Sequence, residues 1–257
     1  MRPQFLTLPY LTRYFNFIAK LNSFFSSKDL SAPRILNYHS IDNNKDLYSV
    51  TKEDLYNHML SIHKSYHYRV NSLTLKNLKN DSIFITFDDG YDNNLDIALP
   101  IMEEFQFPFT IYVTTDPVKK NKKKFLTEIQ LKKISSSPLV TIGSHSKTHP
   151  YLTKCDHLEL KSEIIDSKKY LEDLTGNAIN SFAYPFGDVN SYVANVVEES
   201  GYDFAVTTYP GPINSINKPF YLNRNVILSH DDNVKVLSKI QGHWDWVRHL
   251  IKNPCKR

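Results

Sequence analysis

The sequence predicts an α/β fold in which parallel strands alternate with helices. From residue 34 onward, short runs rich in Val, Ile, Phe and Tyr alternate with longer segments whose apolar residues recur at helical spacing. Polar side chains follow directly after several of these runs, as they do at the carboxyl edge of a parallel sheet. With 257 residues, of which 41% are hydrophobic, the chain is long enough for one large domain with an ordered core.

Seven segments have the composition and length of buried strands. They are short, rich in β-branched and aromatic residues, and bounded by polar or turn-forming residues. They comprise residues 34–38, 83–87, 109–113, 139–143, 181–184, 203–207 and 225–228. Their alternation with helical segments is typical of a parallel sheet or barrel.

Helical spacing connects these strands. In the first helical segment, Leu55, Met59 and Ile62 fall on one face. Gly201 is placed to end a later helix. Helices are expected at residues 52–65, 95–106, 127–135, 158–173, 190–200 and 233–252. No internal repeat or interdomain linker interrupts the pattern, so residues 34–257 are expected to form a single domain.

Residues 1–33 are expected to form an N-terminal helical extension. Charged and polar residues interrupt its apolar sequence, and it lacks a small-residue cleavage site, so it does not resemble a secretory signal. No stretch approaches the roughly 20 apolar residues that cross a bilayer. Aromatic residues within 5–25 recur at helical spacing, which predicts a helix packed on the domain or a peripheral membrane contact. We favour packing, and expect a cytoplasmic or membrane-peripheral location.

Charge and cysteine content argue against several classes of protein. The net charge is +4, and much of it comes from residues 119–124, which we expect to form a solvated loop. This balance does not indicate a nucleic-acid partner. The two cysteines lie far apart in the sequence, so they predict neither a disulfide framework nor a cysteine-ligated zinc site.

Two adjacent carboxylates follow one of the strands. Asp88 and Asp89 come directly after residues 83–87, and two like charges side by side disfavour each other's ionisation. A turn explains the pair simply, because Asp-Gly is a strong turn signal. A bound cation is the other explanation. In that case Asp89 binds the metal, and Asp88 lies beside a coordinated water as its base.

Two histidines follow another strand and strengthen the second explanation. His145 and His149 are four residues apart, so one turn or a tight loop can aim both at one point. Two histidines and one carboxylate form a familiar catalytic metal site with an open position for water. An H-x-x-x-H pair alone is weak evidence, but these histidines share a sheet edge with the Asp-Asp pair.

Several motifs together resemble those of the polysaccharide deacetylases, the NodB-homology group or carbohydrate esterase family four. They are TFDDG at 86–90, HSKTH at 145–149, ILNYHSI at 35–41 and FAYPFG at 182–187. The last two resemble a subgroup with an N-terminal YH strand, and the similarity extends over residues 34–240. The resemblance implies a distorted (β/α)7 barrel that removes acetyl groups from sugars.

The resemblance also implies roles for individual residues. The first aspartate of the motif, here Asp88, is the general base of the family. Asp89, His145 and His149 would hold a divalent metal, with Zn²⁺ the expected ion. Asp88 would then activate metal-bound water for attack on the acetyl carbonyl. The metal and a backbone N–H near Pro185–Phe186 would stabilise the resulting oxyanion.

Two positions depart from the commonest family pattern. Ala183 replaces an arginine that orients the base, which raises the alternative of an inactive barrel. The YH subgroup takes its arginine from a later strand, and Arg224 occupies the matching place; a surface charge is the other interpretation. As the acid that protonates the leaving amine, we predict His39 rather than His230, because the strand order of the subgroup is shifted.

The third motif is expected to contribute to the sugar groove. Tyr184, Pro185 and Phe186 are the predicted substrate-binding residues, although packing in the core explains the aromatic side chains nearly as well.

The predicted function is metal-dependent removal of N-acetyl groups from a GlcNAc-type polysaccharide or glycan precursor. The same residues would serve an O-deacetylase or a deformylase of a lipid-linked sugar. A non-catalytic carbohydrate-binding barrel is a contrasting class. The complete set of base and metal ligands argues against it, because a binding protein needs neither.

Overall fold

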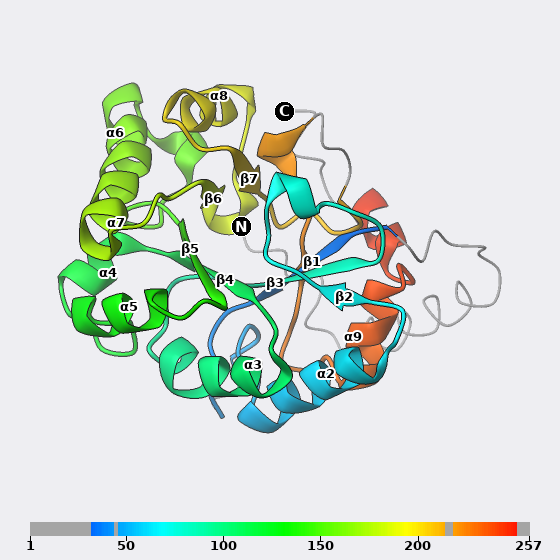
Figure 1. The fold of residues 1–257 in the computed structure, drawn as a ribbon. Helices are drawn as coiled ribbons and strands as arrows, with labels where there is room; N and C mark the ends of the chain where they lie inside the picture. The colour runs from blue at the N-terminus through cyan, green and yellow to red at the C-terminus, as the bar shows by residue number, and fades with distance from the viewer. Residues whose placement is uncertain (1–31, 44–45, 214–217, 251–257) are drawn as a thin grey trace.

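The computed structural model describes residues 32–43, 46–213 and 218–250, and Figure 1 shows their course. Within these residues, parallel strands form one sheet in the order β7–β6–β5–β4–β3–β1–β8, with β2 paired to β3. The strands are β1 (Arg34–Tyr38), β2 (Arg69–Val70), β3 (Ser82–Phe87), β4 (Phe109–Val113), β5 (Val140–Ser144), β6 (Ser181–Ala183), β7 (Phe204–Val206) and β8 (Asn225–Val226). All seven expected strands are present, and β2 is an additional short one.

One short segment brings the two edges of this sheet together. Leu222 forms a parallel bridge with Val206 of β7, and three residues further along the chain β8 begins to pair with β1. The sheet therefore curls into a barrel that is closed by residues 222–226. The prediction of a distorted seven-stranded barrel in a single α/β domain is confirmed.

Helices lie around the outside of the strands, and α2 lies beside α9 (Figure 1). The α-helices are α2 (Lys52–Lys64), α3 (Leu99–Phe105), α4 (Thr115–Lys119), α5 (Glu128–Ser135), α6 (His157–Lys161), α7 (Ser167–Thr175), α8 (Ser191–Glu199) and α9 (Asn233–Ile240). A π-helical turn, η3 (Asn94–Ala98), precedes α3, and another, η5 (Ser162–Asp166), joins α6 to α7.

Capping residues explain where two of these helices begin. The Thr51 hydroxyl accepts a hydrogen bond from the Asp54 N–H at 3.0 Å, and the Asp54 carboxylate accepts one from the Thr51 N–H at 3.3 Å. Thr127 and Gln130 form the same reciprocal pair at the start of α5. Such boxes satisfy N–H groups that have no partner within the helix.

The helix expected at 233–252 is shorter than predicted. A turn at Gly242 separates α9 from a 3₁₀ helix, η8 (Asp245–His249). Gly242 has a φ of +80°, and a Cβ atom there would lie 2.5 Å from Nη2 of Arg34. The buried Arg34 side chain forms two hydrogen bonds with the Asp245 carboxylate, at 2.8 and 3.0 Å. The chain therefore turns at a glycine, because the Arg34 side chain of this ion pair leaves no room for a Cβ atom at that position.

Alternation along the strands separates two regions of the core. In β3, Ile83, Ile85 and Phe87 pack in the large cluster beneath the helices. The intervening Phe84 packs in a smaller cluster with Ile35 of β1. This cluster also contains Tyr112, Ala183 and Val206 from other strands, and Leu222 from the segment before β8. Because side chains on a strand alternate between faces, this smaller cluster lies inside the barrel. Toward the carboxyl ends of β1 and β3, the next residues that face the barrel interior are polar.

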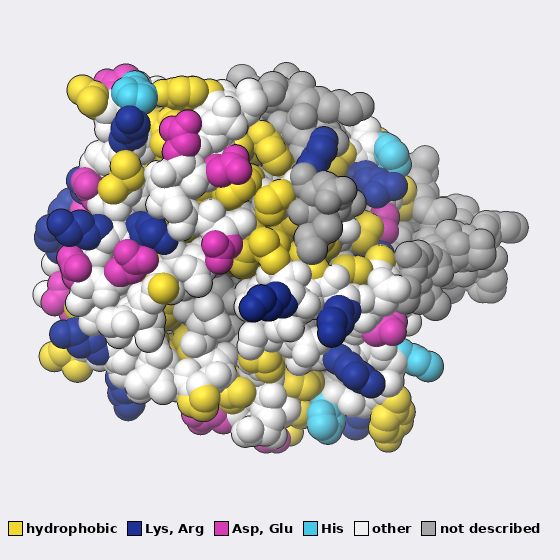
Figure 2. All heavy atoms as spheres, turned by 45° about the horizontal axis from the view of Figure 1, so that its top comes forward, with side chains coloured by type: hydrophobic (Ala, Val, Ile, Leu, Met, Phe, Trp, Pro, Cys, Tyr) yellow, Lys and Arg dark blue, Asp and Glu magenta, His cyan; other side chains and the backbone are white. Residues whose placement is uncertain are grey.

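The surface carries interspersed charges of both signs. Figure 2 shows hydrophobic side chains gathered near the middle of one face, with acidic and basic side chains distributed around them. Residues 119–124 are exposed, as predicted for a solvated loop.

The N-terminal extension remains a prediction. Residues 1–31 lie outside the described part of the chain, and so does the segment 5–25 with its expected helix and membrane contact. Among the described residues, none of the helices is both long and apolar enough to pass through a bilayer.

The barrel interior leaves no room for a side chain at Gly143. A Cβ atom built there would lie 2.5 Å from two ring carbons of Tyr112. We expect Gly143→Ala to lower the free energy of unfolding by about 1–3 kcal/mol, because the ring cannot move without disturbing the interior. Urea unfolding measures this loss. In a Tyr112→Leu background the added cost of Gly143→Ala should shrink, and equal costs in both backgrounds would contradict the steric explanation.

Candidate metal centre and active site

Three side chains from two strand ends converge on one point. Asp89 follows β3, and His145 and His149 lie in the loop after β5. Oδ1 of Asp89 lies 3.6 Å from Nε2 of His145 and 3.5 Å from Nε2 of His149. Ligand atoms bound tetrahedrally at about 2.0–2.1 Å are separated by roughly 3.3 Å, so these distances suit a shared metal ion. Among the described residues, this is the group that could hold one.

Both imidazoles are in the form that metal binding requires. The His145 Nδ1–H donates to the Ala183 carbonyl at 2.7 Å, which leaves the Nε2 lone pair directed toward Asp89. Burial lowers the pKa of His145 to about 3 and lowers the pKa of His149 below its ordinary value. Both rings are therefore neutral near pH 7. Burial also raises the pKa of Asp89, a cost that a bound cation would offset.

Asp88 is buried beside these three residues. Its Oδ1 accepts from Arg224 Nη1 at 2.6 Å, and its Oδ2 accepts from Arg224 Nη2 at 2.7 Å and from Asn37 Nδ2 at 3.0 Å. Its Oδ2 also lies 3.9 Å from Nε2 of His145. Burial alone would raise the pKa of Asp88, but the charge and hydrogen bonds of Arg224 outweigh burial and hold this pKa well below its usual range. Asp88 is therefore ionised and fixed in orientation.

Arg224 lies in the barrel interior. Its side chain is 0% exposed, so the interpretation as a surface charge is wrong. Besides Asp88, it donates from Nε to the Thr207 carbonyl at 2.8 Å and from Nη1 to the Thr86 hydroxyl at 3.2 Å. The centre of its guanidinium lies 5.5 Å from the centroid of the Tyr112 ring. The segment that closes the barrel thus carries the cation that holds Asp88.

Sequence reasoning missed two polar members of this interior layer. Asn37 of β1 and Thr86 of β3 are both fully buried, and Thr86 donates from Oγ1 to the Leu36 carbonyl at 2.9 Å. Both have the same parity as the interior residues of their strands. An amide within a strand that is expected to be buried is a signal that could have identified Asn37.

The two candidate acid histidines occupy different surroundings. His39 is half-buried, and within the described part of the chain its Nδ1 is buried without a hydrogen-bond partner. It lies close enough to Asp88 and Asp89 to interact electrostatically with both carboxylates. His230 is exposed to solvent. Its pKa is lowered, first by partial burial of the ring and then by the charges of the α9 lysines, while Asp231 opposes this shift.

The third motif supplies only one exposed aromatic ring. Tyr184 is fully buried, packs edge-on against Phe182 and donates to the Phe220 carbonyl at 3.1 Å. Its side chain therefore belongs to the core and does not line a groove, which corrects the expectation. Pro185 is also buried. Phe186 is 45% exposed and stands edge-on to the His149 ring, with centroids 4.4 Å apart.

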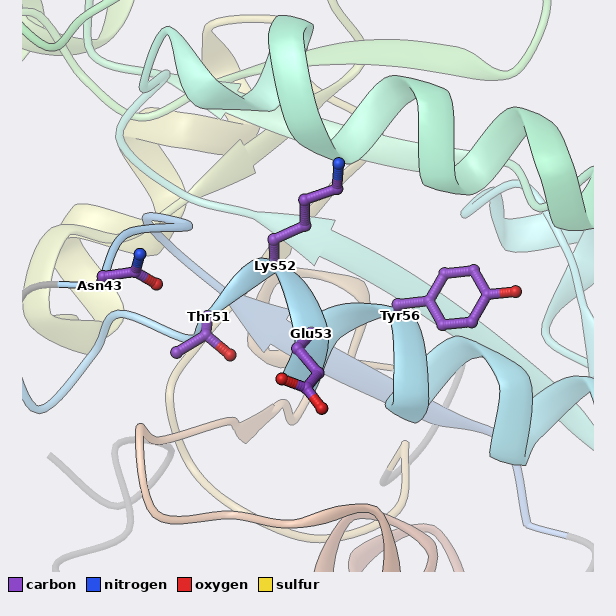
Figure 3. A pocket seen from close by; sticks show the side chains of 5 residues that line it. All are labelled: Asn43, Thr51, Lys52, Glu53 and Tyr56. Carbon is purple, nitrogen blue, oxygen red and sulfur yellow. The ribbon is translucent and has the colours of Figure 1, made fainter.

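A hollow of about 460 Å³ lies elsewhere, at the start of α2. Figure 3 shows the residues that line it, Asn43, Thr51, Lys52, Glu53 and Tyr56. Two of its polar groups are already engaged, since Thr51 caps α2 and the Tyr56 hydroxyl donates to Glu104 at 2.8 Å. The hollow includes none of the residues of the metal centre.

These residues at one edge of a parallel barrel could hold a metal ion beside a carboxylate, and comparison with known proteins identifies the family. The model of the family described as polysaccharide deacetylase matches residues 75–205, just over half of the chain. YxkH of Bacillus subtilis (strain 168), which bears the name of the same family, is 30% identical over 197 residues, covering 74% of this chain and 69% of that protein. The chain belongs to the polysaccharide deacetylase family.

More distant relatives agree with this result. A poly-β-1,6-N-acetyl-D-glucosamine N-deacetylase of Staphylococcus aureus is 22% identical over 175 residues, covering 64% of this chain and 59% of that enzyme. The structure of the Streptococcus pyogenes deacetylase PplD, solved with acetate, superposes with a TM-score of 0.74 at 24% identity, covering 81% of this chain and 98% of that one. BC0361, a polysaccharide deacetylase from Bacillus cereus, gives 0.72 at 26% identity, covering 81% and 69%.

The Asp88–Arg224 pair should couple strongly in stability. We expect Arg224→Met to lower the free energy of unfolding by about 3–5 kcal/mol, because it leaves a buried carboxylate without its partner. Adding Asp88→Asn should recover part of this loss. Urea unfolding of the two single variants and the double variant measures the coupling, and purely additive losses would contradict it.

Proposed function

We propose that this protein is a metal-dependent deacetylase that hydrolyses N-acetyl groups of a GlcNAc-type polysaccharide or glycan precursor. The observation that carries the proposal is the convergence of Asp89, His145 and His149 beside an ionised Asp88. Membership of the polysaccharide deacetylase family supports the reaction class. The name of the staphylococcal relative, which acts on an N-acetylglucosamine polymer, supports the substrate class.

The residues of the centre fit a divalent metal. Asp89, His145 and His149 offer one oxygen and two neutral nitrogens, a donor set that suits Zn²⁺, which we propose as the ion. When bound, such a cation supplies Lewis acidity, which lowers the pKa of water and polarises a carbonyl group.

Asp88 would serve as the general base. Two of its hydrogen bonds come from Arg224 and one from Asn37, so the carboxylate keeps one orientation while it accepts a proton from the attacking water. Water adds to the acetyl carbon, and a backbone N–H near Phe186 would stabilise the oxyanion. His39 would donate the proton that lets the amine leave as the C–N bond breaks. The products are acetate and a free amino sugar.

Other functions of the same fold are distinguished by product. An O-deacetylase would release acetate from esters but not from N-acetyl sugars, and a deformylase would release formate. A carbohydrate-binding barrel without turnover would release neither. The buried, arginine-held Asp88 favours an enzyme, because a binding protein has no use for a fixed carboxylate beside a metal centre.

The first test combines metal content with acetate release. The purified protein should contain a divalent metal and release acetate from poly-β-1,6-GlcNAc or chitooligosaccharides. A chelator should abolish release, and added Zn²⁺ should restore it. A metal-loaded protein that releases acetate from no acetylated sugar would favour the binding alternative.

Substitutions should separate the base from the ligands. Asp88→Asn is expected to keep the metal and lose turnover, because it removes the base and leaves all three ligands. His145→Ala should lose both metal and turnover. Elemental analysis and acetate release measure the two properties. Ordinary activity of Asp88→Asn would remove Asp88 as the base.

The two histidines should differ in their effect on rate. His39→Gln is expected to lower kcat by about 10²–10⁴-fold, the usual contribution of a general acid, with the metal retained. His230→Gln is the matched control, because this histidine is exposed, and its kcat should stay close to that of the parent. The reverse order of the two effects would assign the acid to His230.

A further inference from the structure

A buried carboxylate behind the centre holds the loop that carries both histidines. Glu163 lies in η5 and is only 8% exposed. One of its oxygens, Oε2, accepts from the backbone N–H of Lys147 at 2.9 Å and of Thr148 at 2.8 Å. The other oxygen, Oε1, accepts from the Thr148 hydroxyl at 2.6 Å. Three donors from the two residues just before His149 therefore converge on one side chain.

This loop has an unusual backbone that needs such support. Ser146 and His149 have φ angles of +64° and +65°, in the left-handed region that non-glycine residues rarely adopt. The His149 N–H donates to the Ser146 hydroxyl at 3.0 Å. Successive N–H groups from Lys147 to His149 thus all find side-chain acceptors, in the way that a backbone nest binds an anion.

The opposite side of the loop is fixed by the start of α4. The Thr115 N–H donates to the Ser146 carbonyl at 3.2 Å, and the Asp116 N–H donates to the Lys147 carbonyl at 2.8 Å. The loop is therefore held between the backbone of α4 and the carboxylate of Glu163. Of these two supports, only Glu163 can be removed by substituting a side chain.

The segment that carries Glu163 also contacts the end of β5, the strand that precedes His145. The Ser167 hydroxyl contacts the Ser144 hydroxyl at 2.8 Å, directly before His145, and donates to the Glu163 carbonyl at 2.8 Å. The π-helical turn η5 places Glu163 at this junction. π-turns are frequent at functional sites because they redirect side chains within a helix.

We propose that Glu163 is a positioning residue that pre-forms the metal centre. Glu163 acts through its hydrogen bonds with the Lys147–Thr148 backbone, and it is not itself one of the three proposed metal ligands. Without it, the loop would have to become ordered each time a metal binds, so metal affinity would fall. The inference rests on the proposed function only where it concerns catalysis. The hydrogen bonds between Glu163 and the loop, and their expected effect on metal affinity, do not depend on that function.

Glu163→Gln is the decisive variant, because it keeps the size of the side chain but replaces one acceptor oxygen with a donor. We expect the apparent Kd for Zn²⁺, measured by competition with a chromophoric chelator, to rise about 10–100-fold. At saturating Zn²⁺ the kcat for acetate release should return toward that of the parent. An unchanged Kd in a folded Glu163→Gln protein would overturn the proposal.

Asp166→Asn provides the matched control. Asp166 lies in the same π-turn and accepts from Lys147 Nζ at 3.2 Å, so it contacts the side chain of the loop but not its backbone. Its substitution should leave the Kd for Zn²⁺ essentially unchanged, and a rise equal to that of Glu163→Gln would reduce the effect to general electrostatics. If Glu163→Gln does not fold, Thr148→Ala removes one of the three donors. An unchanged Kd in that variant would then overturn the proposal.

These outcomes separate the inference from the proposed function. A parent protein that binds Zn²⁺ but releases no acetate would end the deacetylase proposal. The Kd of Glu163→Gln would still decide the role of Glu163.

Discussion

The buried ion pair between Asp88 and Arg224 is the interaction on which the rest of the site depends. It joins the end of β3 to the short segment that closes the barrel, two positions separated by 136 residues. Burying two charges costs several kcal/mol per ion, so such a pair adds little net stability compared with apolar packing. It does fix geometry, since both carboxylate oxygens of Asp88 are held. The barrel cannot close in another register without leaving a buried charge unpaired.

This pair also explains how two neighbouring carboxylates share one strand end. Asp88 has a permanent cation in Arg224, and its pKa is held low. Asp89 has no fixed cation against it among the described residues, and burial raises its pKa. Two neutral imidazoles face Asp89 and cannot balance its charge. The protein thus supplies the counter-charge for one carboxylate and leaves the other to be balanced from outside, which is the electrostatic condition of a metal site.

Local patterns in the sequence were sufficient to predict the strands, the helices and the residues at the strand ends, because periodicity and turn residues act over a few positions. They failed where a distant contact decides the outcome. The helix at 233–252 breaks at Gly242 because Arg34, about 200 residues earlier, approaches it. Tyr184 was misjudged although alternation could have placed it, since Phe182 and Tyr184 share the outward parity of β6 and lie in the outer core. The layer around Arg224 combines residues from several strands, so only the folded barrel reveals it.

Left-handed backbone conformations gather around the centre. Asp89, Ser146, His149 and Phe186 all have φ angles between +59° and +75°. Such conformations cost of the order of 1–3 kcal/mol each for ordinary residues, and they persist only where the surroundings enforce them. At Ser146 and His149 these surroundings include the hydrogen bonds that Glu163 accepts from the N–H groups of Lys147 and Thr148, the two residues between them. The cost of shaping the site is therefore met during folding. For the proposed metal ion, ligands already near their bonding positions would mean that little of its binding free energy is spent on ordering the loop.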